Sequence, residues 1–371
     1  MPVPRRQCRA FRPGPRGARR AGMPLTFDTL PGLLAHGHDT LIDVRSPAEF
    51  AEDHIPGAVN LPVLSNEERA EVGTIYVQDS PFRARKIGAA KVFRNAARHI
   101  EGPLADRDGS WRPLVYCWRG GQRSGSFCYL LGQIGWRAET IAGGYQSYRR
   151  LVHTSLYQAP VTARIVLLDG YTGTAKTALL PRLAERGVQV IDLEGLANHR
   201  GSLLGAQAGG QPTQKTFESG LAAALARLDP ARPAVLEAES NKVGNLLIPP
   251  SLWAVMKAAP RIEVTAPLAD RAAYLVEAYR DVWEDSLGLS LQLRKLTALR
   301  GAGVVERWLD LLRERRLPEL AEALMQDHYD PAYATSRRKI GARTLGTVAS
   351  PALTPQGLDR TAVEIASILG T

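Results

Sequence analysis

The sequence is short of cysteine and of long apolar runs. Its 371 residues include three cysteines, Cys8, Cys117 and Cys128, whose spacing fits neither a zinc site nor a disulfide framework. No apolar run approaches the ~20 residues that a membrane helix needs. We therefore expect a protein of the reducing cytoplasm without a membrane span.

Acidic residues are missing from the first twenty positions. This segment holds seven arginines, and subtracting their charge from the formal net charge of +10 leaves +3 for the rest of the chain. The overall charge is thus weak evidence for a nucleic-acid partner. Residues 1–22 are rich in proline and glycine and lack the apolar core of a signal peptide. We expect a disordered tail, with Met23 as a candidate for the true start; an RNA-binding arm is the alternative.

A glycine-rich loop follows a short apolar segment in the first half of the chain. Residues 114–116 predict a buried strand, and Cys117 opens the turn after it. Arginines and backbone N–H groups favour a thiolate, so we expect an exposed Cys117 with a pKa below the usual value of roughly 8.5. Ser124 is expected to cap the next helix. A core cysteine is the alternative. The residues expected to hold an anion beside Cys117 are Trp118, Arg119, Gly120, Gly121, Gln122, Arg123 and Ser124.

This loop and two upstream segments, residues 42–46 and 49–60, resemble a rhodanese domain over roughly residues 26–150. The resemblance implies a cysteine that carries sulfur or selenium as a persulfide-type adduct. Cys117 to Arg123 spans seven residues, one more than the usual sulfurtransferase loop, a length that also suits a Cys-x5-Arg phosphatase and favours a larger, phosphate-bearing donor. Cys128 is expected in a helix core, with a disulfide to Cys117 as the alternative.

An insertion at residues 80–100 is basic and contains no acid. Ile87, Val92, Ala96 and Ile100 recur at helical spacing, which predicts an apolar stripe inward and basic groups outward. Such a face suits an RNA backbone, and a solvated face without a partner is the alternative. The candidate nucleic-acid contacts in this segment are Arg83, Arg85, Lys86, Lys91 and Arg94.

The second half opens on a strand at residues 164–169 and a glycine-rich loop at 170–177. In this strand–loop–helix context backbone N–H groups cradle phosphate, Lys176 reaches its oxygens, and Thr177 is a candidate ligand of Mg²⁺. Ala175 stands where the pattern asks for glycine, so anion binding is expected while ATP use stays open. A structural turn is the alternative. The remaining loop residues are Gly170, Gly173 and Thr174.

Four acids follow two further predicted strands. Asp192 and Glu194 come after residues 188–191, and Glu237 and Glu239 come at the end of residues 234–237. Parallel strands place their carboxyl ends at one edge, so these acids are candidates for binding a metal ion or a water. Helix capping is the alternative for each. No metal ligand is assigned with certainty.

Helical patterns dominate the last third of the chain. Residues 289–316 are expected to be helical, with Arg294 and Lys295 as further candidate contacts of an RNA backbone. Residues 328–333 are expected to end this region, and residues 358–369 predict a terminal helix.

The alternation of strands and helices predicts an α/β fold. We expect a rhodanese-like parallel-sheet domain at residues 23–152, a linker at 153–160, a P-loop NTPase-like α/β domain with a helical extension at 161–345, and a C-terminal helix within 346–371. With the motifs DLEGLANHRGS at 192–202, EAES at 237–240 and HYDPAY at 328–333, the chain from Met23 onward resembles the tRNA 2-selenouridine synthases.

That resemblance implies a tRNA partner whose wobble 2-thiouridine is converted to 2-selenouridine. It implies selenophosphate and geranyl diphosphate as co-substrates, with an S-geranyl intermediate. Cys117 would take selenium while Arg119 and Arg123 stabilise the departing phosphate, and Lys176 and Thr177 would bind the prenyl diphosphate. The alternatives are a Cys-x5-Arg phosphatase or sulfurtransferase fused to a kinase-like P-loop domain, and a non-catalytic tRNA-binding module.

Overall fold

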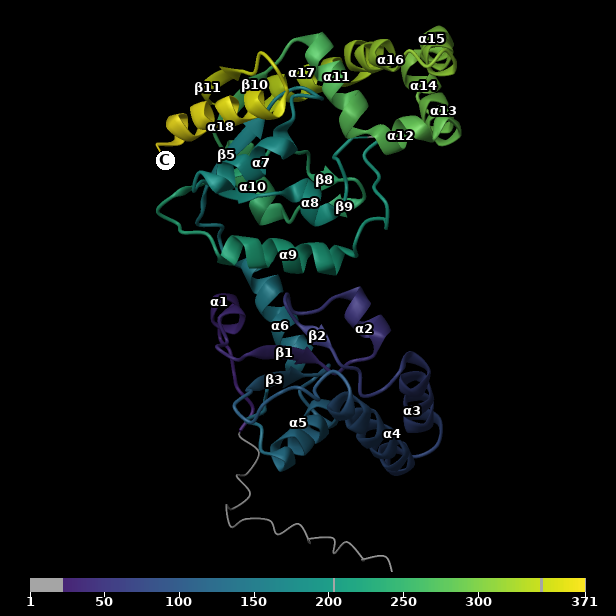
Figure 1. Cartoon of the computed structure of the whole chain (residues 1–371), viewed down its shortest axis with the longest axis vertical. Coiled ribbons are helices and arrows are strands. Elements are labelled where there is room, and N and C mark those ends of the chain that lie inside the picture. Colours follow the sequence, from purple (N-terminus) through teal and green to yellow (C-terminus); the bar gives the residue numbers. More distant parts are fainter. Residues whose placement is uncertain (1–22, 203, 341–342, 371) are drawn as a thin grey trace, which may run out of the picture. The chain divides into compact units, whose positions relative to one another are not determined.

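A computed structural model describes residues 23–202, 204–340 and 343–370, which divide into two compact units (Figure 1). The first unit comprises residues 23–27, 37–50 and 57–147, and the second comprises residues 28–36, 51–56 and the described residues from 148 onward. Each unit has its own core and is described by itself. The tail expected at residues 1–22, with Cys8, lies outside the described residues.

The first unit is built on a parallel sheet in the order β2-β1-β3-β4. Asp43 pairs with Tyr116, so the carboxyl ends of β1 and β3 lie at one edge, where Cys117 follows. Val115, Phe127 and Leu131 belong to its apolar core. The elements are β1 (Thr40–Asp43), α2 (Pro47–Glu52), β2 (Val59–Asn60), α3 (Asn66–Gln78), α4 (Pro81–Glu101), β3 (Pro113–Tyr116), α5 (Gln122–Ile134) and β4 (Glu139–Thr140).

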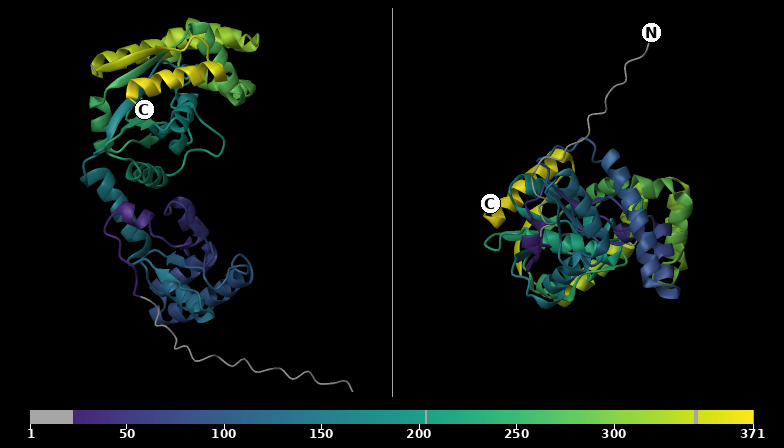
Figure 2. Two further views of the ribbon diagram at one scale, coloured as in Figure 1. Left: turned by 60° about the vertical axis from the view of Figure 1, so that its left-hand side comes forward. Right: turned by 90° about the horizontal axis from the view of Figure 1, so that it is seen from below.

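Helices α3 and α4 of this unit lie side by side as a hairpin (Figure 2). Ser65 and Glu68 form a capping box at the start of α3, and Ser80 caps α4. Helix α4 buries Ala84, Gly88, Val92 and Ala96, whereas Ile87 and Ile100 are half-buried. The predicted helix with an inward apolar stripe is therefore confirmed, and the stripe begins one turn earlier than expected.

The second unit is built on a parallel sheet in the order β11-β10-β5-β7-β6. Val166, Leu168, Leu179 and Val235 form part of its core. The α/β class with parallel sheets is confirmed. The sheet and its partners are β5 (Arg164–Asp169), α7 (Lys176–Glu185), β6 (Gln189–Ile191), α8 (Leu193–Ala197), α9 (Gln214–Ala226), β7 (Pro233–Glu237), β8 (Lys242–Val243), β9 (Leu246–Leu247), α10 (Pro250–Ala258) and β10 (Arg261–Thr265).

The boundary expected at residue 346 falls inside an edge strand of this sheet. Strand β11 (Thr344–Ala349) pairs with β10, and helix α18 (Pro355–Leu369) packs on α7, where Figure 2 shows it in yellow. Ile365 and Ala362 of α18 enter the same core as β5. Residues 346–370 therefore complete the P-loop sheet and do not form a separate end.

The helical extension differs from the expected pattern at two points. Residues 289–316 are not one continuous stretch, because Gly301 adopts φ +87° between two of its helices. Residues 328–333 do not end the region, since the chain continues helically to Ile340. The elements are α11 (Leu268–Ala278), α12 (Arg280–Glu284), α13 (Ser286–Arg294), α14 (Thr297–Arg300), α15 (Ala302–Arg313), α16 (Leu317–Leu324), the π-helix η2 (Met325–Tyr329) and α17 (Asp330–Ile340).

The expected linker at residues 153–160 is also mostly helical. Helix α6 (Gly144–His153) runs into the π-helix η1 (Thr154–Gln158), whose Leu156 is fully buried. Helix η1 contacts α9 and α10. The chain thus enters the second unit as a packed helix.

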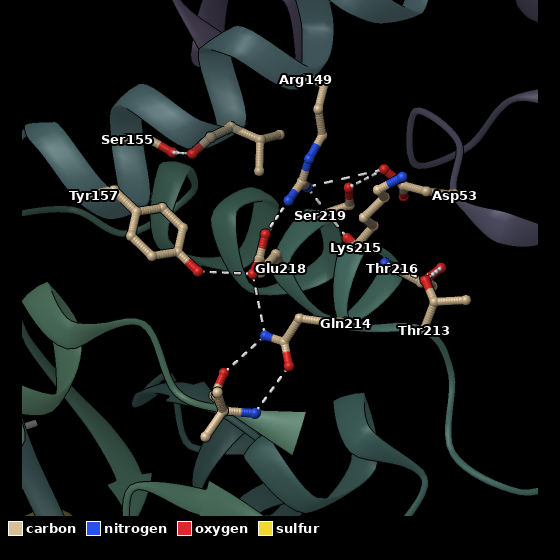
Figure 3. Close-up of polar contacts among 12 residues, drawn as sticks. Asp53, Arg149, Ser155, Tyr157, Thr213, Gln214, Lys215, Thr216, Glu218 and Ser219 are labelled. Carbon is tan, nitrogen blue, oxygen red and sulfur yellow. Dashed lines mark hydrogen bonds and ion pairs between the residues drawn. The ribbon is translucent and has the colours of Figure 1, made fainter. Parts of the chain in front are cut away.

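Two short segments from the N-terminal part of the chain belong to the second unit. Helix α1 (Leu30–Leu34) packs on α9 through Leu30 and Leu33. Residues 51–56 reach α9 through polar contacts, among them Ser219 Oγ to Asp53 Oδ2 at 2.9 Å and Thr213 Oγ1 to the Glu52 carbonyl at 2.6 Å (Figure 3). The second unit therefore includes residues from inside the expected rhodanese-like range.

Candidate functional site

Cys117 lies directly after β3, and its side chain is 3% exposed. The expectation of an exposed cysteine is therefore wrong. Ser124 Oγ lies 3.2 Å from Cys117 Sγ and 3.3 Å from the Gly121 carbonyl, so its hydroxyl donates toward the sulfur or the loop. Helix α5 starts at Gln122 with Gly121 at the N-cap and no side-chain cap. The expected capping role of Ser124 is wrong, and Ser124 instead supports the sulfur.

The loop after Cys117 is fixed by close backbone contacts. Gly120 has φ +65°, and a Cβ there would lie 2.5 Å from the Ile141 carbonyl oxygen. Tyr145 N–H donates to the Cys117 carbonyl at 2.8 Å, and Gln146 N–H donates to the Trp118 carbonyl at 3.1 Å. The glycine is required because no side chain fits this approach. The first N–H groups of α5 lack partners within the helix and remain available to an anion.

Arginine residues brace this loop in different ways. Arg123 pairs with Glu49 at 2.7 Å; burial alone would raise the pKa of Glu49, but the hydrogen bond and charge of Arg123 hold it below its ordinary value. Arg45 is buried, pairs with Asp43 and stacks over the Tyr145 ring at 4.0 Å. Arg119 is exposed. Of the two arginines expected to stabilise an anion, Arg119 is exposed to solvent and Arg123 is already bound to a carboxylate.

A pocket of about 810 Å³ lies between this loop and the α3–α4 hairpin. Its lining includes Cys117, so the buried sulfur faces a ligand-sized space. The loop contributes Cys117, Trp118, Arg119, Gly121, Gln122 and Arg123, whereas Gly120 and Ser124 do not line the pocket.

Cys128 lies on the buried side of α5 and is a free thiol, as is Cys117. Burial, with a smaller contribution from Glu139, raises the pKa of Cys128 to about 11. The prediction of a helix-core residue is confirmed.

The glycine-rich loop of the second unit joins β5 to α7 as predicted. Ala175 adopts φ 58° and ψ 31°, a left-handed conformation that explains why glycine is preferred at this position. Lys176 Nζ donates to the Gly170 carbonyl at 2.7 Å, so the ammonium folds back on its own loop. Thr174 Oγ1 donates to the Tyr171 carbonyl at 2.9 Å, and a Cβ on Gly173 would lie 2.9 Å from the Arg271 carbonyl oxygen.

The four predicted acids meet at the carboxyl edge of this sheet. Thr177 Oγ1 donates to Glu194 Oε2 at 2.8 Å, and Leu193 N–H donates to Glu237 Oε2 at 2.9 Å. Loss of hydration, followed by the charge of Glu194, raises the pKa of Glu239 to about 8. Loss of hydration also raises the pKa of Glu194, and burial next to these acids raises that of Glu237. Asp192 accepts from Gly195 N–H at 2.6 Å and caps α8, the alternative given for it.

The donor set at this edge fits a Mg²⁺ that is shared with a ligand. Within residues 23–202, 204–340 and 343–370, no group of three or more His, Cys, Asp or Glu side chains is arranged as a metal site. Thr177 and Glu194 place two neighbouring side-chain oxygens beside the phosphate loop. Mg²⁺ commonly uses one or two such protein ligands and completes its shell with substrate phosphates and water.

Aromatic side chains wall the pocket above the phosphate loop, which has a volume of about 570 Å³. Lys176 Nζ lies 5.6 Å from the centroid of the Tyr333 ring. Arg271 donates hydrogen bonds to both the Thr172 carbonyl and the Asp330 carboxylate. The pocket is lined by the predicted loop residues Gly173, Thr174, Lys176 and Thr177, by Asp192 and Glu194, and by Arg200, Tyr274, Tyr279, His328, Tyr329 and Tyr333. Gly170, Glu237 and Glu239 do not line it.

His328 is held in one tautomer within this lining. Arg300 Nε donates to His328 Nδ1 at 3.0 Å, so the ring nitrogen that carries the proton is Nε2. Burial, and then the charge of Arg300, lower the pKa of His328. Sequence reasoning missed Tyr274, Tyr279 and Arg300, since no local motif marks them.

The basic residues predicted to contact tRNA lie on two separate elements. On α4, Arg85, Lys86 and Arg94 are exposed, Arg83 is exposed but pairs with Asp79 at 2.5 Å, and Lys91 pairs with Glu71 at 2.9 Å. On α13, Arg294 pairs with Glu306 at 3.2 Å, and the adjacent Lys295 donates to Gln292 at 3.1 Å. The α4 face carries the stronger unbalanced positive charge. No helix among the described residues is long and apolar enough to cross a bilayer.

The fold and the two sites define a protein that combines a rhodanese-type cysteine loop with a P-loop anion site. A rhodanese-like domain profile matches residues 26–151, and the tRNA 2-selenouridine synthase AAA domain profile matches residues 163–292. Proteins named tRNA 2-selenouridine synthase from Hahella chejuensis, Chromohalobacter salexigens and Pseudomonas syringae pv. syringae are 34%, 35% and 31% identical to the chain. These alignments cover 82%, 78% and 82% of the chain and 86%, 80% and 90% of those proteins. The chain belongs to the tRNA 2-selenouridine synthase family.

Proposed function

We propose that this chain is a tRNA-modifying transferase that converts wobble 2-thiouridine to 2-selenouridine. The observation that carries the proposal is the position of Cys117 in a family member: a buried sulfur, 3.2 Å from a hydroxyl, that lines a pocket large enough for a nucleotide. The P-loop pocket in the same chain supplies an anion site for a second co-substrate. The exposed basic face of α4 suits the phosphates of the tRNA.

The first step we propose is alkylation of the thiouridine sulfur. That sulfur attacks carbon 1 of geranyl diphosphate, the carbon–oxygen bond breaks and diphosphate leaves, while the N3 proton of the base is released to solvent. The loop N–H groups, with Lys176 turned away from the Gly170 carbonyl, would stabilise the departing diphosphate. Thr177 and Glu194 would hold a Mg²⁺ that neutralises part of its charge.

The second step replaces the alkylated sulfur by selenium. The oxidation state of selenium in the donor determines which atom Cys117 attacks. Selenium in selenophosphate is already at the selenide level, so joining it to Cys117 sulfur while phosphate leaves would require removal of two electrons. Attack of the Cys117 thiolate on phosphorus instead breaks the phosphorus–selenium bond and releases hydroselenide. Hydroselenide then displaces geranylthiol, which leaves with a proton, and water frees the cysteine from its phosphate. This route replaces the selenium adduct expected on Cys117.

Substitution of Cys117 separates the two steps. Cys117→Ser should abolish 2-selenouridine and leave S-geranyl-2-thiouridine accumulating, because only the second step uses the thiolate. Mass spectrometry of tRNA nucleosides after incubation with selenophosphate and geranyl diphosphate makes the measurement. Cys128→Ser is the matched control and should retain both products. Formation of 2-selenouridine by Cys117→Ser would refute the role of this residue.

Substitution of Lys176 tests the prenyl site. Lys176→Ala should slow geranylation by about two orders of magnitude, since one charged donor to the leaving diphosphate is lost. Selenation of RNA that already carries S-geranyl-2-thiouridine should be unaffected. Lys257→Ala, at an exposed position on α10 of the same unit, is the control. An unchanged geranylation rate in Lys176→Ala would contradict the assignment.

The spacing of the cysteine loop favours a second candidate function. Cys117, Arg123 and Ser124 stand at the spacing of a Cys-x5-Arg phosphatase, which predicts turnover of a generic aryl phosphate. The ion pair between Arg123 and Glu49 opposes this function, because the arginine would have to leave a carboxylate to bind phosphate. A non-catalytic tRNA-binding module, in contrast, would bind tRNA without producing a modified base.

A further inference from the structure

The pocket beside Cys117 has an apolar wall that the core of the first unit does not use. Helix α3 has no fully buried residue, yet Val72, Tyr76 and Val77 turn toward this pocket from its C-terminal half. Tyr76 is 56% exposed and Val77 is 82% exposed. Ala84 and Ala89 of α4 form the facing side. Exposed apolar groups that gather on one concave surface usually mark a binding site.

The composition of this wall selects its ligand. The hairpin offers few polar partners, so a base or a sugar placed against it would lose hydrogen bonds to water without replacement. A hydrocarbon chain would instead gain from leaving water. Four arginines also contribute to the lining, Arg69 and Arg85 from the hairpin and Arg119 and Arg123 from the loop. The pocket therefore combines an apolar wall with cationic groups that suit an anionic co-substrate or the RNA backbone.

We propose that this groove holds the hydrocarbon chain of an S-alkylated 2-thiouridine while its sulfur is replaced at Cys117. The inference rests on the proposed function, since it takes the S-geranyl nucleoside as the substrate of the second step. In that step the geranyl hydrocarbon is joined through a single sulfur atom to the base carbon that receives selenium. A geranyl group attached at this position must lie beside the cysteine loop. The α3–α4 wall is the apolar surface that lines the same pocket as Cys117.

The groove lets the enzyme recognise the hydrocarbon group of the substrate in the second step. Binding of the chain would align the carbon–sulfur bond next to the selenium donor. RNA that carries a short S-alkyl group lacks this contact and should react more slowly. Selectivity for a long chain is thus the property that separates this site from a simple thiol-exchange centre.

The test uses the full-length protein and two synthetic anticodon stem-loop RNAs, one with S-geranyl-2-thiouridine and one with S-methyl-2-thiouridine. Selenophosphate is supplied, and kcat/KM for 2-selenouridine formation is measured for each RNA. We expect wild type to prefer the geranyl RNA by at least tenfold. Ala89→Trp, which fills the groove, should reduce this preference at least tenfold. Val77→Ser, which makes the exposed rim polar, should reduce it by a smaller factor.

Ala90 provides a matched control. It is the next residue on α4, is exposed like Ala89, and does not line the groove. Ala90→Trp should keep the wild-type preference, and circular dichroism melting curves of both tryptophan variants should agree with each other. Equal preferences in Ala89→Trp and wild type would overturn the groove assignment while leaving the proposed function intact. Failure of wild type to selenate the geranyl RNA would instead refute the proposed function, and the inference with it.

Discussion

The surroundings of Glu239 on balance oppose its negative charge, although Lys176 offsets part of the effect. Loss of hydration and the neighbouring Glu194 raise its pKa to about 8, from an ordinary value of 4.5. The folded protein therefore holds a proton on Glu239 between these two pH values, where the unfolded chain has released it. Folding stability from this group is fully present below pH 4.5 and is lost as the pH rises through 8.

Glu239→Gln should therefore raise the melting temperature at pH 8.5 and leave it nearly unchanged at pH 4.5. The amide has the shape of the carboxyl group but carries no charge at either pH. Calorimetric melting of both proteins from pH 4.5 to 8.5 makes the measurement. Glu364→Gln, at an exposed position of α18, is the control. A gain of equal size at every pH would show that charge is not the cause.

Residue-level chemistry was predictable at the phosphate loop but less so at the cysteine loop, where Cys117 is buried and Ser124 does not cap α5. The position of Lys176 and Thr177 at the start of α7 follows from the glycine-rich motif. The same motif asks for glycine at position 175, where Ala175 adopts a left-handed backbone conformation. The partners of these residues come from distant segments. Tyr274 lines the phosphate pocket, while Arg271 and Arg300 hold the lining residues Thr172 and His328 in place. No local sequence pattern predicts these contacts.

At the scale of elements, a buried polar network joins the end of α6, η1 and α9 (Figure 3). Glu218 is 4% exposed and accepts from Arg149, from Tyr157 at 2.7 Å and from Gln214 at 3.1 Å. Arg149 is the only formal positive charge among these three donors. Its removal would leave a buried carboxylate without charge compensation.

Arg149→Met should destabilise the protein by about 3 kcal/mol, since unpaired buried charges cost roughly 3–5 kcal/mol. The double variant Arg149→Met/Glu218→Gln should recover part of this loss, because Glu218 no longer carries a charge. The recovery is partial because Asp53, whose Oδ2 lies 3.9 Å from Arg149 Nη1, still loses its ion pair with Arg149. Urea unfolding of the single and double variants gives the comparison. The Glu218→Gln single variant completes the comparison. If the free-energy losses of the two single variants simply add in the double variant, the two side chains do not interact.

Strands were easier to predict than helix continuity. The strand expected at residues 164–169 coincides with β5, since its apolar run has sharp ends. Polar residues at 153–160 looked like a linker, but Leu156 provides enough burial to keep η1 helical. Conversely, the helical pattern at residues 289–316 predicted a continuous helical stretch. Gly301 interrupts it, because its positive φ ends α14 and precedes α15. Tertiary packing decided these cases, and local sequence does not encode it.

At the scale of the whole molecule, the chain alternates between its two units before it settles in the second. Residues 28–36 and 51–56 belong to the second unit, whereas residues 37–50 and 57–147 belong to the first. A cut near the expected linker at 153–160 therefore does not separate two self-sufficient parts.

A fragment of residues 23–152 should be poorly soluble and should melt below the full-length protein. Without α9, Leu30 and Leu33, now 4% and 1% exposed, would face water, and each buried leucine contributes roughly 1.5–3 kcal/mol. Dye binding to exposed apolar surface and melting curves make the measurement. The same fragment with Leu30→Ser and Leu33→Ser should regain solubility. A fragment as stable and soluble as the full-length protein would show that α1 does not depend on α9.

The packing of α1 and residues 51–56 on α9 also sets an order for folding on the ribosome. These segments leave the exit tunnel early, but their partner surface at Gln214–Ala226 is made only after more than half of the chain has been translated. At about 5–20 residues per second, they wait on the order of ten seconds or more for it. During this interval the nascent chain displays unpaired leucines, which are what chaperones recognise.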